Sequence, residues 1–136
     1  PALAADPAEA WRLVAEADSL APEYDRAYYN VENRMFMAAV LHRAGLPDSA
    51  RATLARASQE ADDPHMDPQR DLWLREAIVR SRIGETEEAV ALVSRYLVAN
   101  PGHRFDQGYG LSWWWRELEP EPSFRRLLAL QAQSEH

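Results

Sequence analysis

The sequence predicts an all-α protein of about six helices that is built from internal repeats. Three observations lead to this fold class. Apolar residues recur at steps of three and four between proline and glycine breakers, which is the spacing of one helix face. No segment alternates apolar and polar residues with a period of two, so no sheet is expected. Part of the apolar pattern also recurs further along the chain.

The first three helices are expected near residues 7–20, 24–44 and 47–61. Their apolar stripes consist of Ala8, Trp11, Val14, Ala15 and Ala17, then of Tyr24, Tyr28, Val31, Met35, Ala38 and Leu41, and then of Ala50, Leu54, Ala57 and Ala61. Pro22 separates the first helix from the second, and Gly45 with Pro47 separates the second from the third.

The last three helices are expected near residues 69–83, 86–99 and 121–132. The fourth and fifth carry the stripes Trp73, Leu74, Ala77 and Ile78, and Ala89, Val90, Val93, Tyr96 and Leu97. Glu85, Glu87 and Glu88 place carboxylates at the start of the fifth helix, where the helix dipole favours them. The breakers are Pro64, Pro68, Gly84, Pro101 and Gly102.

A repeated spacing follows two of the glycines. Gly45 precedes Ala50, Leu54 and Ala57 by the same intervals that separate Gly84 from Ala89, Val93 and Tyr96. Near the start of the chain, Ala10, Val14, Ala17 and Pro22 match Ala89, Val93, Tyr96 and Pro101. Equivalent positions of three units therefore fall at Ala10, Ala50 and Ala89, and the two steps between them are nearly equal.

These units resemble tetratricopeptide repeats, in which two antiparallel helices cross closely at a small residue. "IGETEEAVALVSRYLVANP" and "DPAEAWRLVAEADSLAPE" are similar to the second half of such a repeat. Trp73 takes the aromatic position of the family's first helix, Ala77 the small position, Gly84 the turn, Ala89 the crossing and Pro101 the terminal proline. The resemblance implies a right-handed α-solenoid of antiparallel helical hairpins. It also implies one domain over 1–136, with a half repeat at 1–22, repeats at 23–64 and 65–101, and a capping tail at 102–136.

The resemblance also implies a concave groove lined by the first helix of each hairpin. By position, that face consists of Glu32, Met35, Phe36, Ala39, His42, Arg43, Asp71, Leu74, Arg75, Ile78, Ser81 and Arg82. Nine of these residues are the predicted partner-binding set: Met35, Phe36, Ala39, His42, Arg43, Leu74, Arg75, Ile78 and Arg82. An alternative is that they pack on a neighbouring helix or are merely solvated.

The tail "WRELEPEPSFRRLL" at 115–128 resembles a segment that follows the last repeat in bacterial multidomain signalling proteins. Just before it and at its start stand Trp113, Trp114 and Trp115. These rings could stack on a sugar or a peptide proline, but three adjacent helical residues spread over about 200° and cannot all face one ligand. A cap over the open end of the solenoid is the favoured interpretation.

Composition excludes several classes of site. The 22 acidic residues exceed the 15 basic ones, all of them arginine, and the net charge of -7 disfavours nucleic acid as a ligand. The absence of cysteine excludes disulfides and thiolate chemistry. No apolar run approaches the ~20 residues that cross a bilayer, so no membrane insertion is expected. A cytoplasmic location is expected, with a periplasmic or secreted fragment left open.

No pattern in the sequence indicates an enzyme, a cofactor or a metal site. There is no paired-histidine zinc motif, no nucleophile elbow and no glycine-rich phosphate loop. The loop "EADDPHMDPQRD" groups Asp62, Asp63, His65, Asp67 and Asp71, but its spacing fits an acidic connector better than a cation site. Glu76 stands in an apolar stretch, and a salt bridge to Arg80 one turn later is expected.

Two functions follow from this interpretation. The preferred one is a non-catalytic interaction module that binds a peptide or helical segment, mainly apolar with one or two acids, in the concave groove. The alternative is a structural or sensory C-terminal appendage of a larger bacterial signalling enzyme or transcription regulator. Such an appendage would act through intramolecular contacts or through self-association of the N-terminal half repeat.

Overall fold

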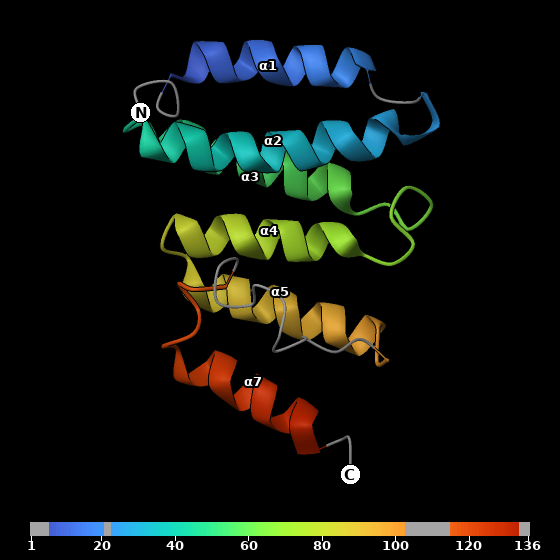
Figure 1. Ribbon diagram of the computed structural model, residues 1–136, viewed down its shortest axis with the longest axis vertical. Helices are drawn as coiled ribbons and strands as arrows, with labels where there is room; N and C mark the ends of the chain where they lie inside the picture. The colour runs from blue at the N-terminus through green and yellow to red at the C-terminus, as the bar shows by residue number, and fades with distance from the viewer. Residues whose placement is uncertain (1–5, 21–22, 103–114, 134–136) are drawn as a thin grey trace.

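The computed structural model describes residues 6–20, 23–102 and 115–133, and within these ranges the chain is helical and has no strand (Figure 1). Its elements are α1 (Pro7–Leu20), the 3-10 helix η2 (Glu23–Asp25), α2 (Arg26–Arg43), α3 (Pro47–Ala61), α4 (Asp71–Arg82), α5 (Thr86–Ala99) and α7 (Pro122–Gln133). The predicted all-helical class is confirmed. The largest errors in the predicted helix ends, 24 against Arg26 and 69 against Asp71, are two residues.

Consecutive helices from α1 to α5 run in alternating directions (Figure 1). α2 packs most extensively against α3, and α4 packs most extensively against α5. α2 also lies against α4, while α1 contacts α2 and α7 contacts α5. The described part of the chain is thus a stack of helices in which α2 and α4 each contact several neighbours.

The turns that join α2 to α3 and α4 to α5 have the same backbone geometry. Gly45 and Gly84 have φ values of 84° and 89°, in the left-handed region that favours glycine. The N–H of Leu46 donates to the carbonyl of Leu41 at 3.0 Å, and the N–H of Glu85 donates to that of Arg80 at 2.8 Å. These hydrogen bonds close the C-terminus of each helix and reverse the chain toward the next one.

Most of the buried apolar residues that the structure describes belong to two clusters. The α2–α3 cluster consists of Val31, Met35, Ala38, Leu54, Ala57, Ala61, Leu72 and Val79. The tail-side cluster consists of Leu74, Ala77, Ile78, Ala89, Leu92, Val93, Tyr96, Trp115, Leu118 and Phe124. Phe36 packs against both clusters, and α4 contributes residues to both, so the stack has a continuous interior.

The alanines predicted to lie at helix crossings are buried. Ala50 and Ala89 each have 0% of their surface exposed. A methyl group at these positions lets the paired helices approach closely, and a longer side chain would force them apart. The burial that the resemblance implies for the crossing positions is therefore confirmed for both residues.

Among the described residues, no helix is both long enough and apolar enough to cross a bilayer. The cytoplasmic location expected from the sequence stays a prediction.

Candidate functional site

The predicted groove residues on α2 divide into buried and accessible ones. Met35 has 0% of its surface exposed and belongs to the α2–α3 cluster, so it cannot contact a ligand, which corrects its assignment to the groove. Phe36 and Ala39 are half-buried, whereas His42 and Arg43 in the last turn are exposed. The face of α2 that remains accessible therefore combines two apolar side chains with two nitrogen donors.

The predicted groove residues on α4 are mostly covered. Leu74 and Ile78 are only 8% and 5% exposed, because they belong to the cluster that also contains Trp115, Leu118 and Phe124 of the tail. This burial corrects their assignment to the partner-binding set. Ser81 is also buried, and its hydroxyl donates to the carbonyl of Ile78 at 2.7 Å.

The cationic residues of the predicted set have different surroundings. Nε of Arg75 on α4 donates to Oε2 of Glu32 on α2 at 3.2 Å, and 39% of the Arg75 side chain is exposed. This ion pair joins the two helices across their contact. Arg82 is half-buried at the end of α4, whereas Arg43 is exposed. The three arginines therefore do not form one open row.

Two tyrosines, Tyr28 on α2 and Tyr96 on α5, have raised pKa values. Burial, followed by the nearby Glu32 carboxylate, raises the pKa of Tyr28 to about 12. Burial and the neighbouring Asp71 carboxylate also raise the pKa of Tyr96, whose hydroxyl donates to Oδ1 of Asp71 at 3.5 Å. Both phenols are neutral at physiological pH and contribute hydrogen-bonding groups rather than charge.

The part of the tryptophan cluster that the structure describes belongs to the core. Trp115 is 6% exposed and stacks on Phe124, with ring centroids 6.2 Å apart and an interplanar angle of 27°. Ligand stacking therefore does not apply to Trp115, which instead joins the tail to α4 and α5. Trp113 and Trp114 lie outside the described residues.

The loop between α3 and α4 organises the start of α4. Asp67 is buried, and its carboxylate accepts the backbone N–H of Asp71 at 3.0 Å and of Leu72 at 2.9 Å. These bonds satisfy donors that the first turn of a helix leaves without partners. Asp62 instead pairs with Arg70 at 2.7 Å, so the loop is not uniformly solvated. Within the described ranges, no group of three or more His, Asp or Glu side chains is arranged to hold a metal ion.

The expected ion pair of Glu76 is confirmed, and it adjoins a pocket that the sequence pattern did not indicate. Arg80 donates through Nε to Oε2 of Glu76 at 2.7 Å. The pocket, here called the Trp73 pocket, has a volume of about 360 Å³ and is lined by Ser58, Gln59, Asp62, Trp73, Glu76, Leu92 and Arg95. These residues come from α3, α4 and α5 and from the residue that follows α3, so no local spacing in the sequence could have revealed the pocket.

Helix α1 has an open apolar side. None of its residues is buried, and Trp11, Leu13 and Leu20 are 38%, 51% and 78% exposed. Leu13, exposed Ala17 and Leu20 follow one another at steps of four and three and therefore share one stripe, here called the α1 stripe. A half repeat without its hairpin partner is expected to leave Trp11, Leu13, Val14 and Ala17 open, and all of them except the half-buried Val14 are exposed.

No protein-family model, no curated protein and no solved structure matches this chain. The resemblance to tetratricopeptide repeats and to the tails of bacterial signalling proteins stays a prediction.

Proposed function

We propose that the chain is a non-catalytic protein-interaction module. In this proposal it is a right-handed solenoid of antiparallel helical hairpins, similar to tetratricopeptide repeats, that binds a peptide or helical segment of a partner protein. The equivalent turns at Gly45 and Gly84, and the contact between α2 and α4, support the repeat interpretation. Stacked hairpins of this kind present extended faces to their ligands.

The observation that carries the proposal is a stripe on α2 that keeps exposed surface. Phe36, Ala39 and Arg43 follow one another at steps of three and four, with His42 next to Arg43 in the last turn. Half-buried apolar groups beside exposed donors suit a mainly apolar segment with one or two carboxylates. An arginine holds such a carboxylate through two parallel hydrogen bonds.

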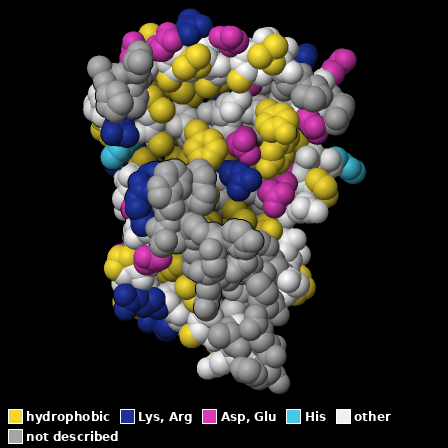
Figure 2. Space-filling view, viewed as in Figure 1, with side chains coloured by type: hydrophobic (Ala, Val, Ile, Leu, Met, Phe, Trp, Pro, Cys, Tyr) yellow, Lys and Arg dark blue, Asp and Glu magenta, His cyan; other side chains and the backbone are white. Residues whose placement is uncertain are grey.

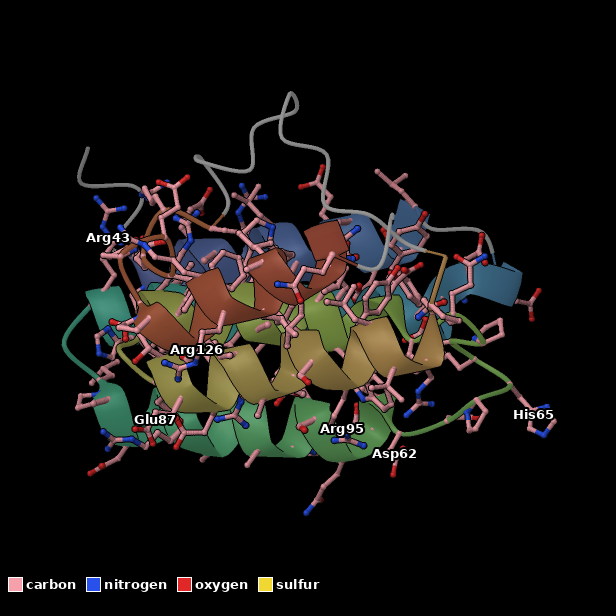
Figure 3. The ribbon with its side chains drawn as sticks, turned by 90° about the horizontal axis from the view of Figure 1, so that it is seen from below. Arg43, Asp62, His65, Glu87, Arg95 and Arg126 are labelled. Atoms are coloured by element: carbon pink, nitrogen blue, oxygen red, sulfur yellow. The ribbon has the colours of Figure 1, made fainter. Side chains whose placement is uncertain are left out.

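A photo-crosslinking amino acid placed at Arg43 tests this surface. The matched control carries the same amino acid at Glu87, an exposed position at the start of α5 that lies apart from Arg43 in Figure 3. The proposal expects a partner segment to be crosslinked through position 43 and not through position 87. That segment, made as a peptide, should bind the Arg43→Ala variant at least about fivefold more weakly. If the peptide binds both Arg43→Ala and Arg75→Ala with unchanged affinity, the proposed binding surface is wrong.

The open side of α1 favours a second candidate, a structural appendage that associates with another copy of itself. The α1 stripe exposes two leucines on one side of a helix that contains no buried residue. Sedimentation equilibrium of the chain and of the double variant Leu13→Ser, Leu20→Ser measures this association. A dimer that dissociates in the double variant, but not in Leu130→Ser on α7, favours the appendage. If the chain is monomeric even at high concentration, the self-associating appendage is ruled out.

A further inference from the structure

The Trp73 pocket lies on the side of the molecule formed by α3 and α5. Figure 3 shows Asp62 and Arg95 close together there, away from Arg43 and Arg126. This position separates the pocket from the α2 stripe. A ligand of the pocket is therefore independent of the surface proposed above.

Trp73 organises the cations at the pocket. The guanidinium of Arg70 lies over its ring at 4.4 Å from the centroid, and that of Arg95 lies over it at 4.3 Å. Cations at this distance are attracted to the π electrons of an indole ring. The ring thus holds the exposed Arg95 at the pocket although no salt bridge anchors it within the described residues.

The carboxylates of the pocket are already paired. Asp62 accepts from Nη2 of Arg70 at 2.7 Å, and Glu76 accepts from Nε of Arg80 at 2.7 Å. The side chain of Glu76 is 4% exposed, so it is not available to a ligand. The acidic groups that line the pocket therefore do not make it a site for cations.

The groups without a partner can all donate hydrogen bonds, although the hydroxyl and the amide can also accept them. Within the described part of the chain, the guanidinium of Arg95, the hydroxyl of Ser58 and the amide of Gln59 form no hydrogen bond to another side chain or to the backbone. Arg95 is a cation of the pocket without a salt bridge among the described residues, and together with the two neutral groups it suits a monoanion. A phosphate monoester, which carries about -1.5 to -2 charges, would require a second free cation.

Arg70 keeps Arg95 available. Its side chain is 9% exposed, its Nη1 has no hydrogen-bond partner, and it stands at φ 62° in the left-handed region although it is not a glycine. A backbone conformation of this kind persists only where the surrounding structure determines it, and such backbone outliers cluster at functional sites. By neutralising Asp62, Arg70 prevents that carboxylate from pairing with Arg95.

We propose that the Trp73 pocket binds the carboxylate side chain of an aspartate or glutamate in a partner peptide. Arg95 provides the charge-assisted hydrogen bonds, Ser58 and Gln59 provide neutral ones, and Leu92 contacts the aliphatic part of the side chain. Arg70 is a positioning residue that holds Asp62 away from the ligand site.

An NMR titration of the full chain tests the proposal with two compounds of nearly equal shape. N-acetyl-L-glutamate α-amide carries the carboxylate, and N-acetyl-L-glutamine α-amide carries a neutral amide in its place. The expected result is a saturable shift of the Trp73 indole N–H and the Arg95 Nε–H, in the millimolar range, with the first compound alone. Equal shifts with both compounds would overturn the proposal, and this comparison needs no variant.

Three variants sharpen the test. Arg95→Gln should weaken binding at least about tenfold, whereas Arg126→Gln, which removes an exposed arginine of α7, should leave it unchanged. Asp62→Asn should strengthen binding about two- to fivefold, because it leaves the Arg70 cation without its carboxylate and so makes the surroundings of the pocket more positive. Weaker binding in Asp62→Asn, or retained binding in Arg95→Gln, contradicts the proposal.

Two further compounds test whether the pocket prefers a cation or a terminal carboxylate to the side chain of glutamate. Saturable binding of N-acetyl-L-arginine amide in preference to the glutamate compound would show a cation site and overturn the proposal. N-acetylglycine carries only a terminal carboxylate. Tighter binding of N-acetylglycine than of the glutamate compound would overturn the assignment to a side chain.

Discussion

Gly45 and Gly84 occupy the same position in two helix-to-helix turns, one in each helical hairpin, with φ values of 84° and 89°. No other atom lies within 4 Å of the place where a Cβ would be added at either glycine. The effect of an alanine on the free energy of unfolding therefore depends there on the left-handed backbone conformation alone. We expect Gly45→Ala and Gly84→Ala each to lower the free energy of unfolding by about 1–2 kcal/mol in urea denaturation.

Gly102 provides the control for this prediction. A Cβ at Gly102 also meets nothing within 4 Å, but Gly102 is not among the glycines with positive φ. Gly102→Ala should change the free energy of unfolding by less than about 0.5 kcal/mol. If all three alanine variants had the same free energy of unfolding, the left-handed conformation of Gly45 and Gly84 would not be the reason for a loss of stability.

Overpacking tests the close approach of α4 and α5. Ala89 has no exposed surface, so Ala89→Leu must push the neighbouring helix away, and we expect a loss of about 1–3 kcal/mol in the free energy of unfolding. Ala91 lies on the exposed side of the same helix, and Ala91→Leu should stay within about 0.5 kcal/mol of the original chain. A neutral Ala89→Leu would show that the two helices do not cross closely at this residue.

The carboxylate of Asp67 should stabilise the start of α4. Asp67→Ala leaves the N–H groups of Asp71 and Leu72 without their acceptor in a buried place, and we expect a loss of about 1–3 kcal/mol. Asp63→Ala removes an exposed carboxylate from the same loop, where it accepts the N–H of His65 at 2.9 Å. Thermal unfolding followed by circular dichroism should separate the two variants, and equal midpoints would refute the capping role of Asp67.

Alkaline pH should weaken the fold through Tyr28. Its pKa is raised to about 12 in the folded chain, whereas an unfolded tyrosine ionises near pH 10. The stabilisation by the neutral phenol is therefore complete below pH 10 and is lost as the pH rises from 10 to 12. We expect the free energy of unfolding of Tyr28→Phe to fall less steeply over this interval.

Ultraviolet absorbance measures the same ionisation directly. The difference between the titration curves of the original chain and Tyr28→Phe should show a phenol that ionises near pH 12. A difference curve centred at pH 10 would indicate that Tyr28 is as accessible as a free tyrosine.

The helices could be predicted from the sequence because their signals are local. Apolar spacing and breakers such as Gly45 and Gly84 act within one or two turns, and Ala89, which is buried, belongs to the apolar stripe of its helix. The α4 half of the groove could not be predicted. An apolar stripe indicates that Leu74 and Ile78 pack against another part of the protein. It does not show that this part is the tail, which follows only after α5.

The Trp73 pocket could not be predicted for a related reason. Trp73 and Arg95 belong to different helices, and their contact depends on how α4 packs against α5. The left-handed backbone of Arg70 carries no signal in the sequence either, because arginine is not a residue that favours this conformation. Only the packed structure joins these three side chains.

The place of α4 between the two apolar clusters sets an order of local opening along the chain. Because α4 contributes to both clusters, we expect the amide hydrogens of its buried residues to be among the slowest to exchange. Helix α1 has no buried residue and contributes to neither cluster, so we expect it to open while the rest stays folded. A partner that covers the α1 stripe would therefore slow the exchange of α1 far more than that of α4, which would reveal the binding surface even before the partner is identified.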